Sequence, residues 1–102
     1  MAREEIPTEI LAKISGHLRA ADELLGPRDV EVGICVERAQ VRIEGLLGTL
    51  PVRGERPRGT AVEHLEEAVA LAEEHLGFSG VGGQIRRAVE EALSEALSQE
   101  EP

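Results

Sequence analysis

Residues 28–50 of the chain, RDVEVGICVERAQVRIEGLLGTL, decide the fold. A β-strand is one interpretation, because residues 30–36 alternate and are rich in β-branched side chains. A longer pattern of apolar residues at spacings of three and four favours an α-helix, which turns about 100° per residue. Residues 37–40 are also poor turn residues for a hairpin, so the stretch predicts a helix. Its expected buried face consists of Val32, Val36, Ala39, Ile43, Leu46 and Leu50.

The same stretch carries a second apolar face. Val30, Ile34 and Val41 fall about 180° away from the first face, with two glycines nearby. A corner helix of a four-helix bundle normally exposes a polar outer face. Two interpretations follow. Either this helix is packed on both sides within its own chain, or Val30, Ile34 and Val41 contact another subunit or a partner protein, as exposed apolar patches commonly do.

Three further helices are predicted from the same spacing, over residues 7–25, 61–76 and 81–98. Gly26 and Pro27 end the first of them, because glycine caps a helix and proline cannot continue it. Thr60 and Glu63 form a capping-box pattern at the start of the helix predicted over residues 61–76. The expected buried residues are Leu11, Ile14, Leu18, Ala21 and Leu25; Val62, Leu65, Val69, Ala72 and Leu76; and Ile85, Ala88, Val89, Ala92, Leu93, Ala96 and Leu97.

Residues 51–59, PVRGERPRG, are expected to form a mobile connector, because two prolines and two glycines prevent regular structure. This connector divides the chain into two helix pairs. The sequence therefore predicts a single all-α domain over residues 1–102, a four-helix antiparallel bundle built from two helical hairpins. Each hairpin needs the other to bury its apolar face, so completion or exchange of hairpins within a homodimer is the alternative.

The formal net charge is −9, and residues 60–102 contribute most of it, with two Arg against ten Glu. Such a chain repels phosphate backbones, and with Phe78 as its sole aromatic residue it cannot stack on bases, so direct nucleic-acid binding is not expected. No apolar run is long enough to cross a membrane, and we expect a cytoplasmic location. The absence of Asn and the excess of Arg over Lys are typical of a thermostable protein, a GC-rich genome or a design.

Few residues offer reactive chemistry. Cys35 is the sole cysteine and is expected to be buried. Among the histidines, His64 and His75 lie about 16 Å apart along one helix, too far to share a metal. His17 and His64 lie on different helices and could together hold a metal or haem. No catalytic template matches, so we expect no catalytic residues, no cofactor and no metal, with the histidines at the edge of the core.

These observations favour a non-enzymatic protein–protein interaction or assembly module that forms a homo-oligomer. Val30, Ile34 and Val41 are its candidate interface. Two alternatives stay open. The acidic C-terminal half would suit a regulator or inhibitor of a basic, nucleic-acid-binding protein, and the bundle could instead bind a small ligand, haem or metal through His17 or His64.

Overall fold

The computed structural model describes residues 6–25, 30–49 and 58–100, which form four α-helices and no strand. The helices are α1 (Thr8–Leu25), α2 (Val30–Leu47), α3 (Ala61–His75) and α4 (Gly80–Glu100). The all-α prediction is confirmed, and the strand interpretation of residues 30–36 is wrong. The observed bounds differ from the predicted ones by three residues or fewer.

Local chemistry sets several helix ends. Thr60 caps α3 by accepting a hydrogen bond from the Glu63 amide (3.1 Å), and the Glu63 carboxylate accepts one from the Thr60 amide (2.9 Å). This reciprocal pair confirms the predicted capping box. At the end of α2, Gly48 adopts a φ of 85°, a left-handed conformation that glycine reaches without steric cost. The helix therefore ends at Leu47, before the predicted position 50.

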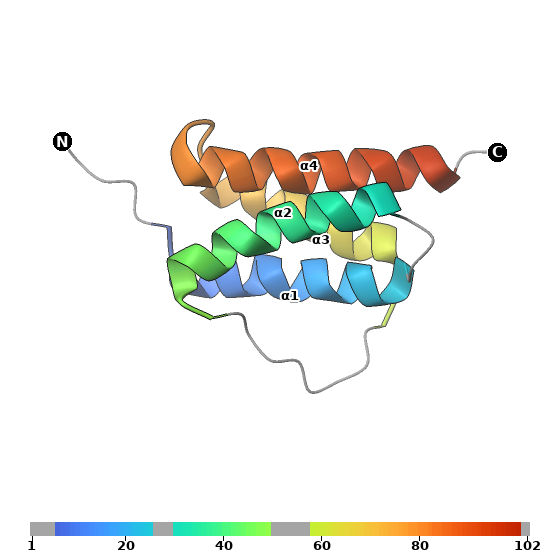
Figure 1. Ribbon diagram of the computed structural model, residues 1–102, viewed down its shortest axis with the longest axis horizontal. Coiled ribbons are helices and arrows are strands. Elements are labelled where there is room, and N and C mark those ends of the chain that lie inside the picture. The colour runs from blue at the N-terminus through green and yellow to red at the C-terminus, as the bar shows by residue number, and fades with distance from the viewer. Residues whose placement is uncertain (1–5, 26–29, 50–57, 101–102) are drawn as a thin grey trace.

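The four helices form a bundle in which the order around the perimeter is α1, α2, α4, α3. The most extensive packing joins α2 to α4 and α1 to α3, followed by α3 with α4 and then α1 with α2. Each of these neighbouring pairs runs antiparallel, and α2 ends and α3 begins at opposite ends of the bundle (Figure 1). The larger contacts thus run between the two halves of the chain rather than within each predicted hairpin.

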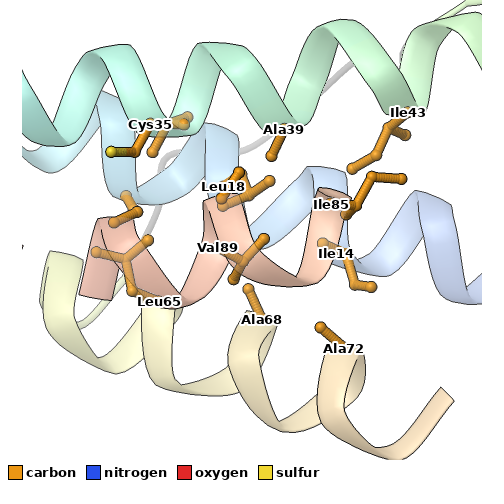
Figure 2. Close-up of a cluster of buried hydrophobic side chains, with 14 of the residues drawn as sticks. Ile14, Leu18, Cys35, Ala39, Ile43, Leu65, Ala68, Ala72, Ile85 and Val89 are labelled. Atoms are coloured by element: carbon orange, nitrogen blue, oxygen red, sulfur yellow. The ribbon is translucent and has the colours of Figure 1, made fainter. Parts of the chain in front are cut away.

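The core is aliphatic and draws on all four helices. Ile14, Leu18, Ile43, Leu65 and Ile85 are fully buried. Their side chains point toward a common centre, where alanines of α2 and α3 allow the backbones to come close (Figure 2). A core without large aromatic groups needs this close approach to fill space at the usual protein density.

Two residues expected in the core are exposed. Leu46 is 46 % exposed because it lies in the last turn of α2, at the edge of the buried face. Leu97 is 43 % exposed because the last turn of α4 extends beyond the ends of α2 and α3 (Figure 1). Leu50 and most of the connector 51–59 lie outside the described residues. None of the helices in the described part of the chain combines the length and the apolar character needed to span a membrane.

Candidate functional site

The outward face of α2 carries a row of exposed apolar side chains. Val30 is 61 % exposed, Ile34 49 % and Val41 59 %. The inward face of the same helix holds Val32 and Ile43, which are fully buried. About half of the Ile34 side chain stays exposed in the described part of the chain, so Ile34 is not a core residue packed between α2 and another helix. We refer to Val30, Ile34 and Val41 as the α2 outer face.

Opposite charges border the α2 outer face. At about 100° per residue, Glu37 and Glu44 lie along one edge. Arg38 and Arg42 lie along the other, together with Glu31 in the first turn of the helix. Both arginines also contact α4: Arg38 Nη1 lies 3.4 Å from a carboxylate oxygen of Glu91, and Arg42 Nε donates to Gln84. These contacts fix the positive edge in place beside the apolar row.

Gly45 lies in the interior of α2 on the same outer face, and its own chain gives no reason for a glycine there. A Cβ atom added at Gly45 would meet no atom within 4 Å other than those of its two chain neighbours and the surrounding backbone of α2. Glycine inside a helix costs roughly 0.5–1 kcal/mol relative to alanine. Gly83, in contrast, is required by the fold, because a Cβ there would come within 2.4 Å of the Phe78 backbone.

A shallow hollow separates α1 from α2 beside the outer face. Arg19 and Asp22 of α1 line it together with Val30, Ile34 and Gln40 of α2. The two helices diverge toward the N-terminal end of α2 (Figure 1), which explains their limited packing. A polar contact between Ser15 and Gln40 joins them instead: Ser15 Oγ donates to Gln40 Oε1 at 2.6 Å, and Gln40 Nε2 donates to the Ser15 carbonyl at 3.1 Å.

Cys35 is 8 % exposed, as the sequence predicted. Burial raises the pKa of its thiol, and the neighbouring Glu91 carboxylate raises it further, while Arg38 opposes this effect. The thiolate is the reactive form of cysteine, so a raised pKa makes Cys35 a poor nucleophile. The residue acts as a small apolar side chain of the core.

His17 of α1 and His64 of α3 form a direct pair. Their Nδ1 atoms lie 3.1 Å apart, and their ring centroids 5.4 Å apart. The other nitrogen of His64, Nε2, lies 2.6 Å from the carbonyl oxygen of Arg58. Because a carbonyl can only accept, His64 carries a proton on Nε2. In the neutral pair, Nδ1 of His64 therefore accepts the hydrogen bond and Nδ1 of His17 donates it.

Burial lowers the pKa of His17, and the adjacent His64 lowers it further, whereas the Glu67 carboxylate raises it. The pair lies in a shallow hollow whose rim includes Arg58, Gly59, Glu63 and Glu67. Within the part of the chain that the structure describes, no cluster of three or more His, Cys, Asp or Glu residues is placed to hold a metal ion. His75 belongs to neither the pair nor the hollow, and its nearest charged partner is Glu74 at 3.9 Å.

Arg86 of α4 contacts the segment that joins α3 to α4, around residues 77–83. Arg86 donates to the Leu76 carbonyl at 3.1 Å, approaches Glu90, and places its guanidinium 4.0 Å from the centre of the Phe78 ring. These contacts of Arg86 fix the turn between α3 and α4.

The apolar spacing of the sequence predicted the α2 outer face, and His17 and His64 were considered together as possible ligands. The Ser15–Gln40 contact and the carbonyl partner of His64 were not predicted. No local signal marks either, because both join residues that only the bundle brings together. No family model, curated protein or solved structure matches the chain.

Proposed function

We propose that the protein is a non-enzymatic assembly module that associates with a second copy of itself through the α2 outer face. The observation that carries this proposal is the exposure of Val30, Ile34 and Val41, about half or more of each side chain, in one row of a helix. Burying apolar surface contributes roughly 25 cal/mol per Å², so covering this row is favourable.

The charged edges favour a second copy as the occupant. When two identical helices pack face to face and parallel, each edge of one helix lies against the opposite edge of the other. Glu37 and Glu44 of one copy would then face Arg38 and Arg42 of the other. In an antiparallel arrangement each edge would meet the like-charged edge, which opposes association. The edges therefore support a parallel α2–α2 contact.

Gly45 supports the same arrangement independently. It adjoins the outer face, and its missing Cβ serves no purpose within the chain. Small residues allow two helix backbones to approach closely, as glycine does at many helix–helix contacts. A second α2 packed on this face gives the glycine a physical role that offsets its cost in helix stability.

Disulfide cross-linking tests the contact and its direction. In a Cys35→Ser background, Val30→Cys and Val41→Cys are introduced singly and oxidised gently. These positions lie about 16 Å apart along the helix. A parallel contact predicts a covalent dimer from each single variant. An antiparallel contact predicts a dimer only when the two variants are mixed. Failure of every combination to cross-link contradicts association through this face. Val81→Cys, exposed on α4, serves as the control.

A second candidate is an acidic regulator that binds a basic protein, and the outer side of α3 favours it. Glu63, Glu66, Glu67, Glu73 and Glu74 are all exposed on this helix. Binding of a basic partner to such a surface would weaken steeply as salt rises, because screening removes the attraction between exposed charges. Salt-insensitive binding of a basic partner would remove this candidate.

A further inference from the structure

We propose that His17 and His64 form a binding site for a divalent transition-metal ion of the Zn²⁺ type, with Nδ1 of each ring as a ligand. The site joins α1 to α3 and is separate from the α2 outer face. It adds a ligand-binding activity to the assembly role and does not depend on it.

The spacing of the two nitrogens fits a shared ion. Two nitrogen ligands of a tetrahedral Zn²⁺, each at about 2.0–2.1 Å, lie roughly 3.3–3.4 Å from one another. The Nδ1 atoms of His17 and His64 are already 3.1 Å apart. Admitting the ion therefore requires the rings to separate by a few tenths of an ångström and to turn both lone pairs toward it. The backbone of neither helix has to move far.

The contact between Nε2 of His64 and the Arg58 carbonyl is of the kind that metal-binding histidines make. Metal-bound histidines usually donate their second ring N–H to a carbonyl or carboxylate, which fixes the tautomer and the ring orientation. Nε2 of His64 lies 2.6 Å from the Arg58 carbonyl, so its Nδ1 lone pair faces His17, from which it accepts a hydrogen bond in the metal-free pair. The Arg58 carbonyl belongs to the segment just before α3, so this segment helps to orient the ligand.

His17 can become the second ligand without losing a proton. In the metal-free pair its proton lies on Nδ1 and is donated to His64. On binding, that proton moves by way of solvent to Nε2 of the same ring, and Nδ1 bonds to the ion. The ring stays neutral throughout.

The surroundings of the pair suit a cation. Glu63 and Glu67 line the hollow, and the charge of Glu67 reaches His17. The Glu63 carboxylate is already engaged at the Thr60 amide, whereas Glu67 follows His64 by three residues on the same side of α3. Water molecules would fill the remaining coordination positions. Imidazole ligands select Zn²⁺, Cu²⁺ or Ni²⁺ over Mg²⁺ and Ca²⁺, which prefer oxygen.

Isothermal titration of the full, tag-free chain with ZnCl₂, after treatment with a chelator, tests the site. We expect one Zn²⁺ bound per chain at pH 7.5 and no heat from MgCl₂. His17→Ala and His64→Ala should each abolish binding, and the matched control His75→Ala should retain it. Ile34→Asp should also retain it, which separates this result from the outcome for self-association. Retention of binding in either His17→Ala or His64→Ala, or no binding by the wild type, overturns the proposal.

A measurement on the wild-type chain covers the case in which either alanine variant fails to fold. Zn²⁺ should shift the Nδ1 nitrogen resonances of His17 and His64, and leave those of His75 unchanged. If these resonances respond to pH and not to Zn²⁺, the pair binds only a proton and the proposal is wrong.

Discussion

Ser15 of α1 and Gln40 of α2 exchange two hydrogen bonds across the least extensively packed pair of neighbouring helices. The Ser15 hydroxyl donates to Gln40 Oε1 at 2.6 Å, and Gln40 Nε2 donates back to the Ser15 carbonyl at 3.1 Å. Ser15 is the buried polar residue of the core, at 2 % exposure among the described residues. Because these bonds fix how far α2 stands from α1, they also set the position of the α2 outer face.

Removing one partner of this contact should lower the free energy of unfolding more than removing both. Ser15→Ala leaves Gln40 Oε1 without its donor in a partly buried position, while the bond from Gln40 Nε2 to the backbone carbonyl of residue 15 stays. We expect a loss of about 1–3 kcal/mol in the free energy of unfolding. The Ser15→Ala/Gln40→Leu pair should recover part of that loss. Urea denaturation of the single and double variants measures the coupling. Strict additivity of the two single effects would show that the bond between the Ser15 hydroxyl and Gln40 Oε1 contributes nothing to stability.

The capping box at α3 should be a local source of stability. Thr60→Ala removes the acceptor of the Glu63 amide, and we expect unfolding to become easier by about 1 kcal/mol. Thr60→Ser keeps the hydroxyl and should change little. Thermal and urea denaturation compare the two variants. Equal destabilisation by Ala and Ser would assign the effect to the lost methyl group rather than to the cap.

Gly45→Ala should have opposite effects on folding and on association. An added Cβ has open space within the chain, so the monomer should gain roughly 0.5–1 kcal/mol from a better helix former. In the α2–α2 contact the same methyl group would separate the two backbones, and the dimer should weaken. Urea denaturation in an Ile34→Asp background measures the first effect, and light scattering without that substitution measures the second.

Two other glycines provide controls for this experiment. Gly16→Ala, on α1, also meets open space and should stabilise the fold without changing the solution mass. Gly83→Ala should destabilise the fold, because its Cβ would overlap the Phe78 backbone. A dimer that is unaffected by Gly45→Ala would mean that the two backbones do not approach at this position.

Acid should destabilise the protein partly through His17. Its pKa in the folded state lies below the ordinary value of 6.5, so the unfolded chain binds the proton more readily. The contribution is fully present above pH 6.5 and is lost as the pH falls from there through the lowered folded pKa. Unfolding curves collected with a chelator should show a shallower pH dependence for His17→Gln than for wild type. Parallel curves for wild type and His17→Gln would contradict this account.

The sequence predicted the helices because their signals are local. Apolar spacing located all four, and the Thr60–Glu63 pair predicted the start of α3 correctly. The order of helices around the bundle could not be predicted, since periodicity identifies the buried face of each helix but not the face it contacts. The exposure of Leu46 and Leu97 followed from the relative lengths of neighbouring helices, which is also a property of the assembled bundle.

The same distinction between local sequence patterns and the packing of the bundle applies to the candidate sites. The α2 outer face was visible in the sequence because a second apolar row within one helix is a local pattern. His17 and His64 could be named as residues on different helices, but their 3.1 Å contact depends on the packing of α1 against α3. The Arg58 carbonyl, a backbone group, has no sequence signal at all.

The solution mass of the wild type and of Ile34→Asp, measured by light scattering over a range of concentrations, tests the central claim most directly. Val81→Asp, which places the same charge at an exposed apolar position on α4, is the control. We expect a wild-type oligomer, an unchanged mass for Val81→Asp, and a folded monomer for Ile34→Asp. A wild type that stays monomeric at every concentration, or an Ile34→Asp variant with the wild-type mass, would contradict assembly through the α2 outer face.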